Sequence, residues 1–160
     1  MPTLGYKPKK MDISTAFLQG KELTRPVYVK PPIEAGVNET KCWLLLKGVY
    51  GLTEASRMWY EQVHKVMVIG GFKRSAVDPA LYFRYNSEGK VTCVLLGHVD
   101  NFLYGGEKYE IKNLELLIGK HFQIREIEVH TYKYCGFLIK ITDTEDGYEI
   151  SLVNQTKFLT

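Results

Sequence analysis

The chain has 160 residues, of which 45% are hydrophobic and 24% charged, and its formal net charge is +3 at pH 7. This composition excludes an intrinsically disordered chain and predicts a folded domain with its own hydrophobic core. Residues 1–10 lack the apolar core of a signal peptide, and no apolar run approaches the ~20 residues of a membrane helix. We therefore expect an intracellular protein of the cytoplasm or the nucleus, with no membrane partner.

The cysteines are Cys42, Cys93 and Cys135, which are widely spaced and form no Cys-x-x-Cys pair. This pattern argues against a zinc site, because structural zinc ligands come in closely spaced pairs. We expect all of them to be reduced residues of the core.

Two basic clusters are present, one of Lys7, Lys9 and Lys10 and one of Lys73 and Arg74. Such clusters can neutralise the phosphates of a nucleic acid, or they can form an ordinary solvated face. The solvated face is the commoner of the two, and it is what we expect here.

The first half of the chain predicts strands and one helix. A short strand that contains Asp12 should break at Ser14 or Thr15, and a turn should follow at Gly20. Apolar residues at helical spacing predict an amphipathic helix between an N-cap at Thr53 and the pair Gly70-Gly71. Further extended segments are expected at residues 27–30 and 42–46.

The second half predicts two hairpins and a second helix. The expected elements are strands at 81–85 and 91–96 around a turn at 86–89, a helix at 107–122, strands at 132–141 and 148–152, and a last helical turn from Asn154. This order predicts an α+β fold, in which an antiparallel sheet carries two helices on one face.

An acidic turn divides the apolar run that begins at Leu95. Asp and Asn favour turns, so Asp100 and Asn101 should form a hairpin tip, while Asp12 closes a buried strand elsewhere. Two carboxylates at the ends of adjacent strands are the minimum set of oxygen ligands for Mg²⁺. The alternative is that Asp12 only ends a strand and Asp100 only makes a turn.

Several motifs, in order along the chain, carry a family likeness. They are residues 11–20 (MDISTAFLQG), 27–30 (VYVK), 48–52 (GVYGL) with 57–60 (RMWY), 71–75 (GFKRS) with 78–82 (DPALY), and 99–100 (VD). Together they resemble the palm region of the copia-type retrotransposon reverse transcriptase, part of the Pol polyprotein. The resemblance implies a polymerase palm-like sheet over residues 11–160 of a single partial domain, 1–160, with incomplete fingers and no ribonuclease H.

The resemblance also implies an activity and its site. The activity is that of an RNA-directed DNA polymerase, which uses Mg²⁺ or Mn²⁺ for two-metal nucleotidyl transfer on an RNA/DNA template-primer and dNTP. The resemblance leaves the protein partner open, including one that supplies the missing fingers. The implied catalytic residues are Asp12 and Asp100, the metal ligands Asp12, Asp100 and Asn101, and the substrate-binding residues Ala16, Phe17, Gly51 and Arg57. Phe17 resembles the aromatic gate that excludes a ribose 2′-hydroxyl, whereas the residues alone predict a core aromatic.

The chain departs from the family pattern at its acidic hairpin and in one turn. Asn101 stands in place of the family's second Asp, His98 in place of its Tyr, and Glu54-Ala55-Ser56 in place of Gln-Ala-Pro. We also expect Glu54 to add negative charge near an incoming nucleotide. These departures predict a degenerate polymerase with weak or no activity, and the alternative is a co-opted, non-catalytic nucleic-acid-binding or scaffolding domain.

Overall fold

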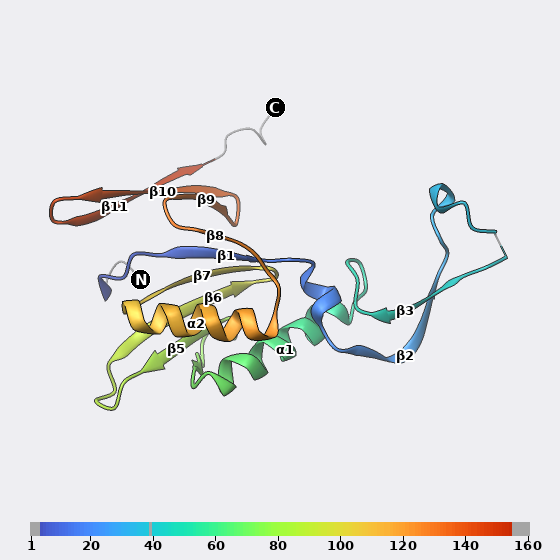
Figure 1. Cartoon of the computed structure of the whole chain (residues 1–160), viewed down its shortest axis with the longest axis horizontal. Coiled ribbons are helices and arrows are strands. Elements are labelled where there is room, and N and C mark those ends of the chain that lie inside the picture. Colours follow the sequence, from blue (N-terminus) through green and yellow to red (C-terminus); the bar gives the residue numbers. More distant parts are fainter. Residues whose placement is uncertain (1–3, 39, 155–160) are drawn as a thin grey trace. The chain divides into compact units, whose positions relative to one another are not determined.

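The computed structural model of the chain describes residues 4–38 and 40–154 (Figure 1). The chain divides into two compact units. The first unit combines the segment up to Ser14 with the segment from His64 onward, and the second is Thr15–Val63. The described residues form antiparallel sheets and two α-helices, which confirms the α+β class.

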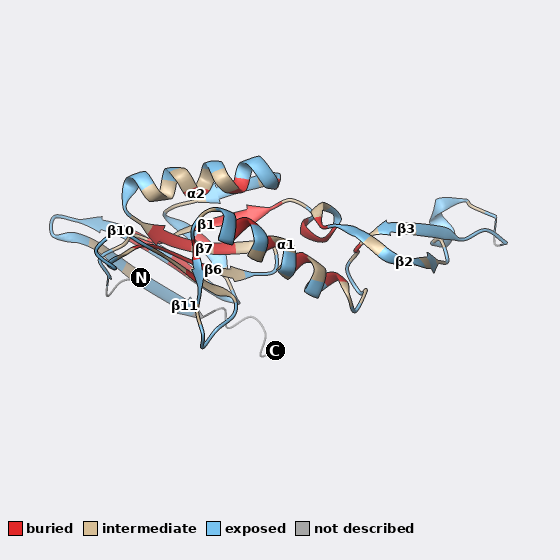
Figure 2. Ribbon diagram, turned by 90° about the horizontal axis from the view of Figure 1, so that it is seen from below, coloured by how far each residue is buried: buried red, intermediate tan, exposed pale blue. Residues whose placement is uncertain are grey.

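A six-stranded antiparallel sheet forms the centre of the first unit, in the order β4-β5-β6-β7-β1-β8. Its strands are β1 (Lys9–Ile13), β4 (Lys73–Arg74), β5 (Leu81–Tyr85), β6 (Val91–His98), β7 (Asn101–Gly106) and β8 (Ile124–Glu128). Buried residues concentrate on β1, β6 and β7, as Figure 2 shows, because these strands lie in the interior of the sheet. The strands predicted at residues 81–85 and 91–96 are confirmed as β5 and β6.

The helix α2 (Lys108–His121) covers one face of this sheet. That face carries a cross-strand row of side chains, namely Tyr82, Leu95, Tyr104 and Lys9. The Glu115 carboxylate of α2 accepts hydrogen bonds from the Tyr104 hydroxyl at 2.7 Å and from Lys9 Nζ at 2.9 Å. These contacts fix α2 over the centre of the sheet.

The second part of α1 (Ala55–Ile69) lies on the same face. His64 Nδ1 is 3.3 Å from the hydroxyl of Tyr82, which belongs to that cross-strand row. Gly70 follows the helix directly, and a Cβ at this position would collide with Leu117 of α2. From His64 onward, α1 and α2 are thus neighbours on one face, as the sequence predicts.

A second, three-stranded sheet in the order β11-β10-β9 faces the opposite side of the six-stranded sheet. Its strands are β9 (Thr131–Tyr134), β10 (Phe137–Thr144) and β11 (Gly147–Asn154). Leu103 of β7 packs against its buried residues Tyr132, Ile139 and Ile141. The side of the main sheet away from the helices is therefore partly covered, and not open along its whole length.

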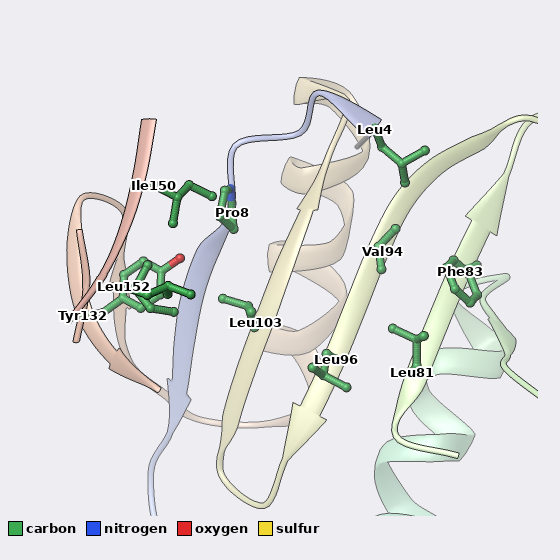
Figure 3. A pocket seen from close by; sticks show the side chains of 11 residues that line it. Leu4, Pro8, Leu81, Phe83, Val94, Leu96, Leu103, Tyr132, Ile150 and Leu152 are labelled. Atoms are coloured by element: carbon green, nitrogen blue, oxygen red, sulfur yellow. The ribbon is translucent and has the colours of Figure 1, made fainter. Parts of the chain in front are cut away.

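An apolar cavity of about 490 Å³ lies between the two sheets (Figure 3). Leu81, Leu96 and Leu103 line it from the main sheet, and Tyr132 and Leu152 line it from the second. The Tyr132 hydroxyl is buried and has no hydrogen-bond partner among the described residues. The two apolar faces thus meet without filling all the space between them.

The second unit contains a two-stranded antiparallel ribbon. Its elements are the 3₁₀ helices η2 (Ala16–Gln19) and η3 (Ile33–Ala35), the strands β2 (Glu22–Val29) and β3 (Trp43–Lys47), and the first part of α1. The strand predicted at 27–30 begins earlier, at Glu22. Pro26 has no N–H to donate, and the pairing with β3 is irregular between Glu22 and Val27, so the strand continues past the proline without regular pairing.

Other predicted elements need correction. The strand predicted at 132–141 is divided by a tight turn, in which Cys135 (φ 47°) and Gly136 (φ 82°) both have left-handed backbone; such a turn joins β9 to β10 in a hairpin. Asn154 ends β11 and does not begin a helical turn, and the rest of that expected turn lies outside the described residues. No pattern in the sequence predicts β4 or β8.

The cysteines also differ from expectation. Cys93 is buried, and burial raises the pKa of its thiol to about 12, so it remains protonated near neutral pH. Cys42 and Cys135 are exposed, and all of them are free thiols. In the described part of the chain, no helix is long and apolar enough to cross a membrane.

Candidate functional site

The acidic hairpin joins β6 to β7 through the two-residue turn Val99-Asp100. The turn lies one residue earlier than predicted, because Asn101 is already the first residue of β7 and pairs with His98. Val99 has a φ of 53°, a conformation that a β-branched residue adopts only under strain. The hairpin therefore holds Asp100 in a strained, tightly defined turn.

β1 brings Asp12 beside this hairpin. Asp12 is the direct cross-strand partner of Asn101, and the backbone N–H of Ile13 donates to the Asp100 carbonyl at 2.7 Å. Asn101 Nδ2 donates to Asp100 Oδ1 at 2.8 Å. The residues predicted as metal ligands thus come together at one end of the sheet.

The Asp12 side chain is buried, with 5% of its area exposed. Its Oδ2 accepts a hydrogen bond from Arg125 Nη2 at 2.9 Å, and its Oδ1 is buried with no hydrogen-bond partner among the described residues. Burial raises the pKa of this carboxyl above its usual range, Arg125 opposes the shift, and the nearby Asp100 carboxylate adds to it. An unpartnered carboxylate oxygen beside a second carboxylate is a place where a cation would be stabilised.

Arg125 is a member of this site that the sequence did not predict. It lies on β8 (Ile124–Glu128), whose alternating charged residues gave no clear strand signal. No pattern in the sequence indicates that this arginine reaches Asp12. In the described part of the chain, no group of three or more His, Cys, Asp or Glu side chains could hold a metal ion.

The predicted substrate-binding residues all belong to the second unit. Ala16 and Phe17 are buried in η2, and the Phe17 ring packs edge-on against Tyr50 with 4.5 Å between centroids. Gly51 has a φ of 88°, which glycine adopts without strain. Arg57 forms an exposed ion pair with Glu61 of the next helical turn, at 3.1 Å.

Glu54 does not present an unpaired charge. Its Oε1 accepts a hydrogen bond from Arg25 Nε at 3.0 Å within the same unit. The expected extra negative charge near a nucleotide is therefore largely balanced by this arginine.

The first basic cluster is only partly a solvated face, because the Lys7–Asp143 pair is exposed whereas Lys10 is buried. Each lysine forms an ion pair with an acidic residue of another element: Lys7 with Asp143, Lys9 with Glu115 and Lys10 with Glu128. Lys10 is buried, and the hydrogen bond from Lys7 lowers the pKa of the Asp143 carboxyl. These lysines connect elements of the fold.

Comparison with known proteins decides the family. Residues 5–159 match the family model described as reverse transcriptase (RNA-dependent DNA polymerase). The chain belongs to this reverse transcriptase family. The resemblance to copia-type retrotransposon enzymes is thereby confirmed.

Curated relatives of this reverse transcriptase chain are transposon proteins. It is 28% identical over 127 residues, or 78% of the chain, to the retrovirus-related Pol polyprotein from transposon TNT 1-94 of Nicotiana tabacum. It is 27% identical over 161 aligned positions, or 95% of the chain, to the retrovirus-related Pol polyprotein from transposon RE2 of Arabidopsis thaliana. A putative transposon Ty5-1 protein of Saccharomyces cerevisiae is 36% identical over 96 residues, or 58% of the chain. The chain spans 10%, 11% and 30% of the lengths of these relatives, respectively.

Proposed function

We propose that this chain is the palm region of a copia-type reverse transcriptase and that Asp12 and Asp100 form its nucleotidyl-transfer site. The observation that carries the proposal is the convergence of Asp12 on β1 and Asp100 on the adjacent hairpin. Family membership supports it, because reverse transcriptases typically act on a nucleic acid template and nucleotides with a divalent metal.

The donor set is suited to a divalent cation, Mg²⁺ or Mn²⁺. The carboxylates of Asp12 and Asp100 would be its charged ligands, and the Asn101 amide oxygen could add a neutral one. A divalent cation at such a site lowers the pKa of an attacking hydroxyl and stabilises negative charge on the transferring phosphoryl group. The strained hairpin would hold Asp100 in place, and burial would keep water from Asp12.

Substrate binding is assigned to the second unit. We propose that Ala16, Phe17, Gly51 and Arg57 contact the nucleotide, with Phe17 as the gate against a ribose 2′-hydroxyl. The edge-on contact with Tyr50 supports a rigidly held ring, which a steric gate needs. The same contact also fits the alternative, in which Phe17 is only a core residue.

Asn101 supports the proposal that the activity is weak. The charge of a second hairpin carboxylate is missing, and at ~4 Å with an effective dielectric constant of ~20 a unit-charge pair is worth about 4 kcal/mol. The amide also donates to Asp100 Oδ1, which occupies one lone pair of a proposed ligand. Cation binding should therefore be weaker than at a site of three carboxylates.

A co-opted, non-catalytic nucleic-acid-binding or scaffolding domain is the second candidate. The contact that favours it is the ion pair between Arg125 and Asp12, which balances the buried carboxylate without a metal. In that case the aspartates would serve only to stabilise the fold.

Extension of an oligo(dT) primer on poly(rA), with Mg²⁺ or Mn²⁺, tests the proposal. We expect slow dTTP incorporation by the chain, stronger with Mn²⁺, and its loss in Asp12→Asn. Asp143→Asn, which makes the same change in an exposed ion pair, should retain the activity. Incorporation that survives Asp12→Asn would reject the site, and template binding without incorporation would favour the second candidate.

A further inference from the structure

Both oxygens of the Asp12 carboxylate are closed off in the structure. Oδ1 is buried inside the protein, and Oδ2 is covered by the Arg125 guanidinium at 2.9 Å. The two partners differ in exposure, since 5% of the Asp12 side chain and 63% of the Arg125 side chain is accessible. Arg125 is therefore the part of this contact that can move into solvent.

A β-bulge places Arg125 against Asp12. Asp12 is paired with Glu126 of β8, but the next residue, Ile13, is paired with Ile124, so Arg125 is the extra residue between two paired positions. In a regular strand, Arg125 and Glu126 would point to opposite faces, and Arg125 would lie on the face away from Asp12. Bulges redirect side chains in this way, and they occur frequently beside active sites.

We propose that Arg125 is a built-in counter-ion of Asp12, which holds the carboxylate in the cation-free chain and must leave before a divalent cation can bind. The proposal rests on the proposed function in that Asp12 is taken as a cation ligand. A buried carboxylate needs a positive partner, and the guanidinium and a divalent cation would compete for it. Arg125 thus acts on the site as a positioning residue.

A second acceptor is available for the released guanidinium. Glu126 Oε1 lies 3.9 Å from Arg125 Nη2, and about half of the Glu126 side chain is exposed. The guanidinium can turn from Asp12 toward Glu126 by side-chain rotation, without movement of the strand. The exchange is therefore a local one.

Arg125→Gln tests the competition through two measurements that need no catalysis. Because the competing cation is removed, we expect Mn²⁺, followed by electron paramagnetic resonance, to bind about tenfold more tightly. In EDTA the same variant should melt on the order of 3 °C lower, because Asp12 loses its partner, and added Mn²⁺ should close that gap. Arg125→Lys should restore part of the stability in EDTA.

Arg25→Gln is the matched control, since it removes the same charge from the exposed pair with Glu54 in the other unit. It should leave Mn²⁺ affinity unchanged. Unchanged or weaker Mn²⁺ binding by Arg125→Gln would overturn the inference. Asp12→Asn tests the proposed site separately. If Asp12→Asn loses Mn²⁺ binding while Arg125→Gln binds Mn²⁺ with the affinity of the unmutated chain, only the inference fails. If Asp12→Asn binds Mn²⁺ normally, the proposed site fails.

The unmutated chain provides a further test, should Arg125→Gln fold poorly. In arginine-labelled protein, the side-chain N–H signals of Arg125 should shift as Mg²⁺ is added, because the bond to Asp12 Oδ2 is lost. Signals that stay unchanged while Mg²⁺ binds would show that Arg125 does not leave, and would overturn the inference.

Discussion

The Asn101 side chain is held between two acidic residues. It faces Asp12 across the β1–β7 pair, and its amide donates to Asp100 Oδ1. We expect Asn101→Asp to bind Mg²⁺ about tenfold more tightly in a calorimetric titration, because a full charge is added beside the cation. Repulsion from Asp100 in the ion-free chain should cancel part of the gain.

Asn86→Asp provides the control for this variant. Asn86 lies at the tip of another hairpin, where its Oδ1 accepts N–H groups of Glu88 and Lys90, bonds that an aspartate can also accept. Its substitution should leave Mg²⁺ affinity unchanged. Equal affinities of Asn101→Asp and the unmutated chain would mean that residue 101 does not face the cation.

The sequence predicts the aspartates of the site better than it predicts Arg125. Asp12 closes an apolar strand and Asp100 divides two apolar runs, so local pattern alone places each at the end of a buried strand. Arg125 reaches Asp12 only through a bulge, and the placement of an extra residue depends on pairing between β1 and β8. The alternation of polar and apolar residues along β8 alone therefore carries no information about where the extra residue falls.

At the scale of elements, Tyr132 of β9 shows how the two sheets meet. Its buried hydroxyl lacks a hydrogen-bond partner in the described part of the chain, so Tyr132→Phe removes an unsatisfied polar group. We expect the free energy of unfolding at pH 7, from urea denaturation, to stay equal or to rise by up to about 1 kcal/mol. A loss of more than about 1 kcal/mol would show that the hydroxyl has a partner.

The same residue predicts a pH dependence. Burial raises the pKa of Tyr132 to about 12, above the value of about 10 in an unfolded chain. The unfolded state therefore loses its proton first, and the stability present below pH ~10 is lost as the pH rises toward ~12. Between pH 9 and pH 11, the free energy of unfolding of Tyr132→Phe should fall less than that of the unmutated chain. The control is Tyr28→Phe, a change at an exposed tyrosine of β2, which should lose as much stability as the unmutated chain.

Helices and strands with a strong periodic hydrophobic pattern are predicted well. Strands that form only through hydrogen bonds to a neighbouring strand are not. The apolar stripe of α2 and the apolar runs of β5 and β6 are local properties of the sequence. β4 has two residues and β8 is mostly exposed, so both exist through hydrogen bonds to a neighbouring strand. The division of residues 132–141 into two strands depends on left-handed backbone at Cys135, a residue that rarely adopts it.

At the scale of the molecule, the proposed reaction is divided between two units. The first unit holds Asp12, Asp100 and Arg125, and the second holds Phe17 and Arg57 among the proposed nucleotide contacts. The chain passes between the units at Ser14 and again within α1. Cation binding at the proposed site would involve residues of the first unit alone.

Cation binding can therefore be located without substrate. The most direct measurement is a Mn²⁺ titration of isotopically labelled chain, in which the amide NMR signals nearest the paramagnetic ion broaden first. We expect the signals of Asp12, Ile13, Asp100 and Asn101 to broaden at the lowest Mn²⁺ concentrations, and we expect Asp12→Asn to abolish the effect. Broadening that begins instead at the acidic turn of β10 and β11, around Asp146, and persists in Asp12→Asn would contradict it.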